Sequence, residues 1–208
     1  MSPAEFDAYF HERASRFSAF YRSERLARLL GRGPLFDRLR LTVDIVVALG
    51  TSRVLDVGCG SGPLFAPLAA RGVAVIGIDP APAMVALARR EAGKFPGLVV
   101  VEERGWENLD DDDAYGAAVA LGVFDYVDEP VELLRRMGRA APHVIASFPA
   151  PGLRLWLRRL RYGARGVHVH GRTPEDLACL AAAGGLTVAE LIPLGRAGHL
   201  AHFARPQR

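Results

Sequence analysis

The chain has 208 residues, half of them hydrophobic, and a formal net charge of +3 at pH 7. This length suffices for one α/β domain with a buried core, and so small a net charge does not by itself indicate a nucleic-acid partner. Two cysteines, Cys59 and Cys179, are too few and too far apart in the sequence to indicate a disulfide framework or a metal cluster.

The first predicted element is a helical region over residues 3–30, in which aromatic and arginine side chains interleave. Phe10 and Phe17 are two helical turns apart, so one face of this region is aromatic. Such a helix either packs on the main domain or forms a lid over a ligand site. We treat residues 1–34 as a separate N-terminal helical segment and a candidate lid. Two of its tyrosines are candidate substrate contacts, namely Tyr9 and Tyr21.

The central stretch of the chain is a short apolar strand that ends in a glycine-rich turn. Asp56 closes the apolar run, and Gly58, Gly60 and Gly62 follow at alternate positions. Glycine lacks a Cβ atom, so the backbone can turn tightly and approach a ligand, and the free N–H groups of the following helix face this turn. Pro63 is expected at the first position of that helix. The dinucleotide pattern G-x-G-x-x-G is disfavoured, because Pro63 occupies the place of its third glycine.

The second strand is predicted over residues 73–78, which are continuously apolar and thus typical of a strand buried on both faces. Asp79 stands at its end. An acid in this position can accept hydrogen bonds from both hydroxyls of a ribose, and capping of the next helix is the alternative. The spacing after Gly62 favours the ribose.

The stretch from Asp56 to Gly62 resembles the first motif of the class I methyltransferases that use S-adenosyl-L-methionine (SAM). In that family the glycine loop passes under the methionine part of the cofactor, so the resemblance implies SAM as cofactor. It also implies a turn beneath the adenine over residues 80–84. Relatives often carry an adenine-binding acid where this chain has Gly105, which leaves Trp106 as a candidate through its backbone N–H group and stacking. The candidate cofactor-binding residues are Asp56, Gly58, Cys59, Gly60, Asp79, Pro80, Met84, Trp106 and Leu121.

The middle of the chain continues the alternation of strands and helices. Helices are predicted over residues 36–49 and 129–139, and strands over residues 98–101, 115–121 and 143–148. In relatives, the loop after the fourth strand borders both cofactor and substrate. Asp125 is therefore a candidate general base, and Tyr126 a candidate substrate contact.

Residues 150–172 are the least standard part, and the resemblance makes them a substrate-covering insertion. Their arginines lie among apolar residues, and they are Arg154, Arg158, Arg159, Arg161 and Arg165. A basic amphipathic helix binds an anionic substrate, a membrane surface or nucleic acid, or is simply solvated. Residues 167–170 alternate like an edge strand, which puts His168 and His170 on one face as further candidate general bases. A metal site there is weakly supported, because no cysteine or acid is close in sequence, and we expect no metal.

The C-terminal part begins with a clear helix start, Thr173-Pro174-Glu175-Asp176, and that helix is expected to end at Gly184-Gly185. Residues 186–193 and 198–203 then predict a hairpin. The alternation of helices and strands predicts an α/β fold. The resemblance makes this a Rossmann-like, seven-stranded, mostly parallel sheet with an antiparallel terminal strand, over residues 35–208.

The resemblance implies a SAM-dependent methyltransferase that transfers a methyl group to O, N or C of a small molecule by in-line displacement. The layout is similar to that of the short bacterial methyltransferases of ubiquinone and magnesium-protoporphyrin biosynthesis. One alternative is an RNA methyltransferase that uses residues 154–165, although residues 121–124 lack the Asn/Asp-Pro-Pro-aromatic signature of base-amine methyltransferases. Another is a non-catalytic module that binds SAM or a nucleotide-like ligand. We expect a small-molecule acceptor and no nucleic acid.

Location follows from the absence of targeting features in the sequence. Residues 1–7 carry acids without an apolar core, which argues against a secretory signal, and the charge-free run 177–189 is too short and glycine-broken to span a bilayer. We therefore expect a cytoplasmic protein, for which peripheral membrane contact is left open.

Overall fold

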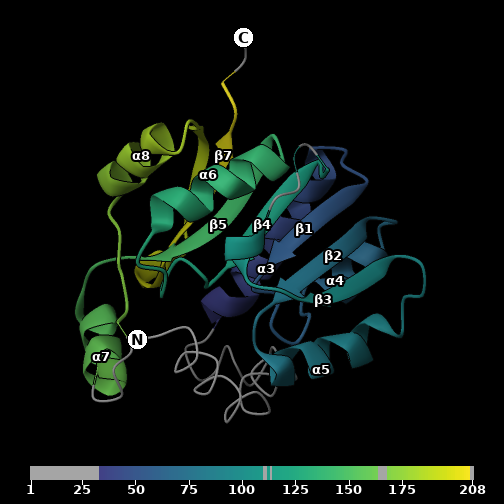
Figure 1. The fold of residues 1–208 in the computed structure, drawn as a ribbon. Coiled ribbons are helices and arrows are strands. Elements are labelled where there is room, and N and C mark those ends of the chain that lie inside the picture. Colours follow the sequence, from purple (N-terminus) through teal and green to yellow (C-terminus); the bar gives the residue numbers. More distant parts are fainter. Residues whose placement is uncertain (1–32, 110–111, 113, 164–167, 207–208) are drawn as a thin grey trace. The chain divides into compact units, whose positions relative to one another are not determined.

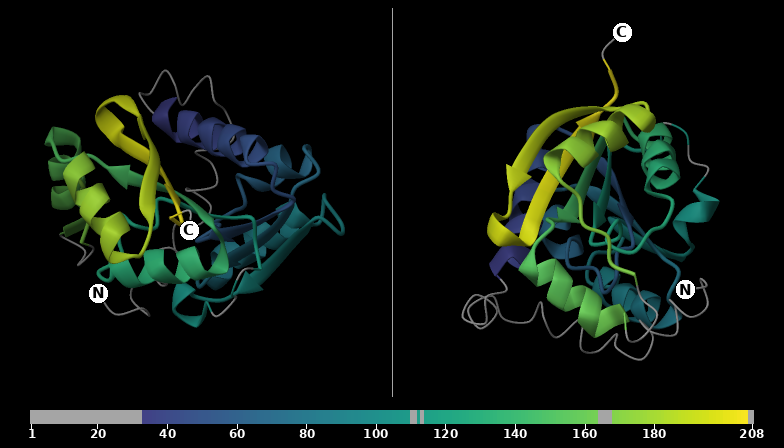
Figure 2. Two further views of the ribbon diagram at one scale, coloured as in Figure 1. Left: turned by 90° about the horizontal axis from the view of Figure 1, so that it is seen from above. Right: turned by 90° about the vertical axis from the view of Figure 1, so that its left-hand side faces the viewer.

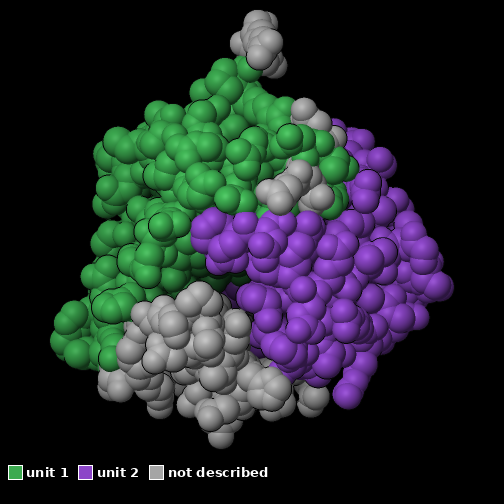
Figure 3. Space-filling view, in the orientation of Figure 1, with its two compact units in different colours: residues 1, 109–208 green, residues 2–108 purple. Residues whose placement is uncertain are grey.

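The computed structural model describes residues 33–109, 112, 114–163 and 168–206. The chain divides into two compact units, one of residues 109–208 with Met1 (unit 1) and one of residues 2–108 (unit 2), as coloured in Figure 3. Tyr9 and Tyr21 lie outside the described residues. The proposed lid over residues 1–34 therefore stays a prediction.

Unit 2 is a parallel α/β arrangement in its described part. Its elements in chain order are α3 (Gly33–Ala48), β1 (Arg53–Val57), α4 (Phe65–Ala69), β2 (Ala74–Asp79), α5 (Pro82–Ala92), β3 (Val99–Glu103) and the 3-10 helix η1 (Trp106–Asn108) (Figure 1). β2 pairs in parallel with both β1 and β3. Strands β1 and β2 are almost wholly buried, as their continuous apolar sequences predict for strands covered on both faces.

Unit 1 combines parallel strands with a C-terminal hairpin. Its elements are β4 (Ala117–Leu121), α6 (Pro130–Ala140), β5 (His143–Pro149), α7 (Leu153–Gly163), α8 (Pro174–Ala183), β6 (Thr187–Pro193), the 3-10 helix η2 (Gly195–Ala197) and β7 (Gly198–Ala204). β4 and β5 are parallel, whereas β7 is antiparallel to both β5 and β6. The strand order of the seven-stranded sheet is β3-β2-β1-β4-β5-β7-β6. The predicted Rossmann-like sheet, mostly parallel with an antiparallel strand near its end, is thereby confirmed.

The helix after the glycine loop begins later than the sequence predicts. Pro63 lies before α4, which starts at Phe65 with Leu64 as its N-cap. The reason is two consecutive turns, in which the Gly62 N–H group donates to the Cys59 carbonyl and the Phe65 N–H group donates to the Gly62 carbonyl. The expectation that Pro63 opens the helix was wrong, because the loop needs these residues for its turns.

The edge strand expected over residues 167–170 is also wrong, since the described residues 168–170 form no strand. The His170 N–H group donates to the Asp125 carbonyl, and the Arg172 N–H group donates to the Pro149 carbonyl. These are single bonds to two separate segments and not a ladder along one strand. The alternation of valine and histidine here reflects a buried Val169 within an irregular segment.

The start of α8 is as predicted. The Asp176 N–H group donates to the Thr173 hydroxyl at 3.2 Å, and the Thr173 N–H group donates to the Asp176 carboxylate at 2.8 Å, which completes a capping box. Within the described part of the chain, no helix has both the length and the apolarity to cross a membrane.

Candidate functional site

The glycine loop after β1 has an unusual backbone that only glycine adopts readily. Gly58, Gly60 and Gly62 have φ angles of 65°, 56° and 80°, in the left-handed region. The Cys59 N–H group donates to the Ile78 carbonyl at 3.0 Å, which fixes the loop to the end of β2. A Cβ atom on Gly60 would meet no atom within 4 Å, so the loop faces open space there. This is the kind of exposed backbone that a ligand can approach closely.

Asp79 joins the glycine loop to the start of α5. Its Oδ2 atom accepts from the Gly60 N–H group and its Oδ1 atom accepts from the Ala81 N–H group, both at 2.9 Å. Ala81 is the N-cap of α5, so the helix-start role that the sequence left as an alternative is present. The structure therefore brings the glycine loop and the acid after β2 together.

Asp56 in β1 and Cys59 in the glycine loop are both buried. Burial, with a smaller contribution from the negative charge of Asp79, raises the pKa of Asp56 to about 8. Burial and the same two carboxylates raise the pKa of the Cys59 thiol well above its usual value. Cys59 is therefore a packing residue in this state, because the thiolate that would react as a nucleophile is disfavoured.

Gly77 in β2 is a site residue that the sequence analysis missed. A Cβ atom at this position would lie 2.8 Å from the Phe65 ring and 3.0 Å from the Cys59 sulfur. Its absence lets the loop and the first turn of α4 pack directly on β2. This is the close helix–strand approach for which the dinucleotide pattern uses its third glycine. A glycine within an otherwise apolar strand was the available signal.

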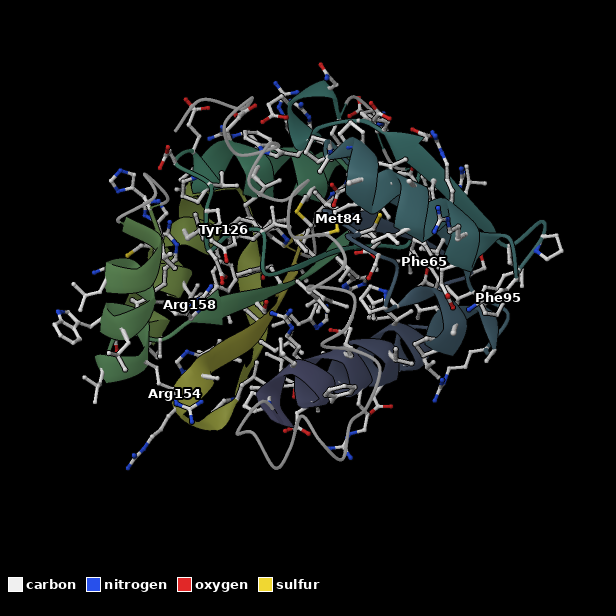
Figure 4. The ribbon with its side chains drawn as sticks, turned by 90° about the horizontal axis from the view of Figure 1, so that it is seen from below. Phe65, Met84, Phe95, Tyr126, Arg154 and Arg158 are labelled. Atoms are coloured by element: carbon white, nitrogen blue, oxygen red, sulfur yellow. The ribbon has the colours of Figure 1, made fainter. Side chains whose placement is uncertain are left out.

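The residues that the resemblance places near an adenine lie in and around α5 and in the segment after β3. Met84 is buried, packs with Ala81 and is labelled in Figure 4, while Pro80 is exposed. The Arg104 N–H group donates to the Asp79 carbonyl at 3.2 Å. The segment that carries Trp106, which is half-buried in η1, thus starts beside the end of β2.

The candidate acceptor residues lie in unit 1, around the loop that follows β4. Leu121 ends β4, and the next N–H group, that of Gly122, donates to the Ser147 hydroxyl at 2.9 Å. Asp125 is only 5% exposed. The Arg158 guanidinium donates to the Asp125 carboxylate at 2.8 Å and to the Tyr126 hydroxyl at 3.1 Å.

Arg158 also covers the ring of Tyr126, with its guanidinium carbon 5.9 Å from the ring centroid (Figure 4). Burial alone would lower the pKa of Arg158, but the negative charge of Asp125 and the phenol of Tyr126 outweigh it and raise the pKa. This arginine is therefore a permanent cation that fastens two candidate residues together. The sequence analysis counted Arg158 only as one of a basic group, because nothing local connects it with Asp125 33 positions away.

The two candidate histidines have different surroundings. The His170 backbone donates to the Asp125 carbonyl at 2.8 Å, and its ring Nε2 atom is 3.1 Å from an Asp128 carboxylate oxygen. His168 is exposed. Asp128 was missed in the sequence. Among the described residues no group of three His, Cys, Asp or Glu side chains could hold a metal ion.

The sequence of the chain matches a family model described as a methyltransferase domain over residues 9–191. A ubiquinone biosynthesis O-methyltransferase of Xanthomonas campestris pv. campestris (strain B100) is 32% identical over 162 residues, which cover 77% of this chain and 59% of that protein. A protein of the same description from Azorhizobium caulinodans is 36% identical over 87 residues, or 41% of this chain and 34% of its own length. The chain thus spans about 59% of the length of the first of these relatives.

Solved structures show the same fold. Magnesium protoporphyrin IX methyltransferase from Synechocystis PCC 6803, with bound S-adenosylhomocysteine (SAH), has a TM-score of 0.70 at 22% identity, over 84% of this chain and 85% of that one. The 1,6-didemethyltoxoflavin-N1-methyltransferase of Burkholderia thailandensis, with bound 1,6-didemethyltoxoflavin and SAH, has a TM-score of 0.67 at 22% identity, over 100% and 92% of the two chains.

These matches confirm the resemblance that the glycine motif indicates. The matched residues 9–191 contain the glycine loop, Asp79 and the loop after β4. The chain belongs to the methyltransferase domain family, within the class I methyltransferases.

Proposed function

We propose that this protein binds SAM and transfers its methyl group to an oxygen, nitrogen or carbon atom of a small molecule. The observation that carries the proposal is the joined pair of the glycine loop and Asp79, at the carboxyl ends of β1 and β2. Open space at Gly60 and a carboxylate hydrogen-bonded to the same loop are what a ligand with a ribose and a flexible amino-acid tail needs.

The residues of unit 2 would hold the cofactor. The loop from Gly58 to Gly62 would lie under the methionine part, Asp79 would accept bonds from the ribose hydroxyls, and Met84 would form an apolar wall for the adenine. The buried Asp56 and Cys59 side chains would support the backbone of this loop, and Pro80 and Trp106 would border the adenine. When bound, SAM supplies a methyl group activated by its bond to a cationic sulfur.

The residues of unit 1 would receive the acceptor. Positioning is the main task of the protein in such a transfer, because a group held in line with the methyl carbon reacts as in a unimolecular step. Tyr126 is proposed to border the acceptor, together with Tyr9 and Tyr21 of the N-terminal segment, and Leu121 is proposed to contact the cofactor. Arg158 keeps Tyr126 and Asp125 in fixed positions.

Removal of the acceptor's proton is proposed for His170, with Asp125 and His168 as further candidates. A histidine whose Nε2–H group donates to Asp128 keeps the lone pair of its Nδ1 atom as a proton acceptor. The acceptor class is supported by relatives and fold neighbours that are described as methyltransferases of small molecules. The proposal includes a cytoplasmic location and no nucleic-acid partner.

The first test compares two glycines that differ only in their place in the fold. Gly60 and Gly72 have φ angles of 56° and 72°, and neither has an atom within 4 Å of the Cβ that an alanine would add. Gly60→Ala and Gly72→Ala should therefore lose similar stability, about 1 kcal/mol each in thermal unfolding.

Binding should separate the two variants, because only the Gly60→Ala methyl group would stand where the ligand passes. Isothermal titration with SAH should show tight binding by the native chain and by Gly72→Ala, and a loss of at least about tenfold (about 1.4 kcal/mol) for Gly60→Ala. Equal SAH affinity in both variants would mean that the glycine loop does not contact the ligand. No SAH or SAM binding by the native chain would end the proposal.

A second pair of variants tests Asp79. Asp79→Asn keeps the shape of the side chain but has one acceptor oxygen in place of two, so SAH affinity should fall at least about tenfold. The matched change Asp44→Asn, at an exposed residue of α3, should leave the affinity unchanged.

Transfer of a labelled methyl group from SAM to a panel of small phenols, amines and enols then separates an enzyme from a module that only binds.

A further inference from the structure

Helix α7 exposes its large apolar side chains, unlike an ordinary surface helix of a folded domain. Such helices bury an apolar stripe and expose their charges. In α7 the large apolar side chains Leu153, Trp156, Leu157 and Leu160 are 71%, 55%, 52% and 56% exposed. Their spacing of three, four and seven positions places them on one face of the helix.

The opposite face of α7 holds it to the rest of unit 1, chiefly by charged side chains. Arg158 donates to Asp125 and Tyr126, and the Arg159 Nε–H group donates to the Val169 carbonyl at 2.9 Å. Of the α7 side chains that the structure describes, Leu155 alone is buried. Two arginines and one leucine thus fix the orientation of the helix, and this orientation points the apolar face outward.

The position of α7 agrees with its exposure. Figures 1 and 2 show α7 standing apart from the helices α6 and α8 of the same unit. Folded proteins rarely expose a contiguous apolar face to water, and such a face usually marks a binding surface.

The charge of α7 indicates which partner fits. The helix carries four arginines and no acidic residue. Arg154 is exposed in the first turn, beside the apolar face, and Arg161 follows two turns later in the sequence. Apolar side chains that include a tryptophan, bordered by arginines, are typical of a helix that lies in the headgroup region of a bilayer.

We propose that α7 is a docking surface for an anionic lipid bilayer. Leu153, Trp156, Leu157 and Leu160 enter the boundary between headgroups and acyl chains, and Arg154 meets lipid phosphates. Arg158 and Arg159 stay bound to the protein and hold the helix in place. A second copy of this chain fits less well, because two such helices would bring their arginines together without an acid on either.

This docking is independent of the proposed methyl transfer, because it uses the outer face of α7 and can be measured without SAM. Trp156 is its own reporter. The chain has two tryptophans, so Trp106→Phe leaves Trp156 as the only tryptophan, whose emission can be excited selectively at wavelengths that tyrosine does not absorb. With vesicles that contain phosphatidylglycerol, its emission should shift to the blue and be quenched by brominated acyl chains. Vesicles of phosphatidylcholine alone should bind at least about fivefold more weakly.

Two substitutions with matched controls test the two parts of the surface. Leu157→Ser should weaken vesicle binding about tenfold, and Val47→Ser, at a 46% exposed valine of α3, should not change it. Arg154→Glu should weaken binding to anionic vesicles at least about fivefold, while Arg40→Glu, an exposed arginine within α3, should leave it nearly unchanged. Far-ultraviolet circular dichroism checks that each variant stays folded.

Three outcomes would overturn the proposal. The first is the absence of any blue shift or co-sedimentation with anionic vesicles by the native chain. The second is equal binding to vesicles with and without phosphatidylglycerol. The third is a dimer in light scattering that Leu157→Ser converts to a monomer, which would assign the face to a second copy of the chain.

Discussion

Asp56 illustrates how a single buried carboxyl group makes stability depend on pH. Its pKa in the folded chain is raised from 3.8 to about 8, so the folded state keeps a proton that the unfolded state releases. The stability that this proton contributes is fully present below pH 3.8 and is lost as the pH rises through about 8. Between these two pKa values, this proton contributes up to about 6 kcal/mol to the free energy of unfolding.

The matching prediction concerns Asp56→Asn, which has the shape of the protonated acid and no charge. The difference in unfolding free energy between the variant and the native chain should shift in favour of the variant by about 2 kcal/mol or more from pH 5 to pH 9. The reason is that only the native carboxyl group must ionise in the interior as the pH rises. Urea unfolding at both pH values measures it. If the stability difference between the native chain and the variant were the same at pH 9 as at pH 5, the argument from burial would be contradicted.

Residues of the candidate site were predictable where they are neighbours in the sequence. The motif from Asp56 to Gly62 and the acid at Asp79 follow from local patterns, and the structure joins them. For Gly77 the local sequence offered only the presence of a glycine in an apolar strand, and for Arg158 it offered no signal. Their roles depend on partners brought close only by folding, Phe65 for the glycine and Asp125 for the arginine.

At the scale of elements, the link between α7 and the loop after β4 depends on Arg158. Its guanidinium is about a third exposed, whereas the Asp125 carboxylate is buried. Removing the arginine leaves that carboxylate without its cation. Arg158→Met should therefore destabilise unit 1 by about 2 kcal/mol, a value below that of a fully buried pair because solvent screens this one.

A double-mutant cycle separates this pair from general damage. Arg158→Met and Asp125→Asn together should cost less than the sum of the two single changes, with a coupling of about 1 kcal/mol. Arg159→Met, which loses one bond to a backbone carbonyl, is the control and should show no coupling with Asp125→Asn. Additive single and double effects would mean that the ion pair is not what holds α7.

Elements with a strong period were predicted well, and irregular ones were not. Buried strands, the capping box before α8 and the hairpin of β6 and β7 all follow from local sequence. The prediction of an edge strand at residues 167–170 was wrong because one buried side chain between two outward ones produces the same alternation over so few positions. The His170 N–H group donates to the Asp125 carbonyl, and the nearby Arg172 N–H group donates to the Pro149 carbonyl. No periodicity in the sequence predicts these bonds.

At the scale of the whole molecule, acid sensitivity should come from two histidines that the sheet brings together. His143 of β5 and His202 of β7 have ring nitrogens 3.1 Å apart, although they are 59 positions apart in the sequence. Burial lowers the pKa of both, and the charge of His143 lowers that of His202 further. The stability that they contribute is present above pH 6.5 and is lost as the pH falls through their lowered values.

The prediction is tested with His202→Gln, which removes one of the two like charges. The unfolding temperature of the native chain should fall between pH 7 and pH 5 by more than that of the variant. His168→Gln, at an exposed histidine, should follow the native chain. Identical pH profiles for His202→Gln and the native chain would contradict a role for this pair in acid unfolding.

Gly77 limits how pieces of related enzymes can be exchanged. The space that its missing side chain leaves is filled by Phe65 and approached by Cys59, so these three positions fit only as a set. A chimera that imports the β1–α4 segment from a relative with different residues there would need that relative's β2 as well. Crossover points for recombination therefore belong after β2 and not within the first β-α-β unit.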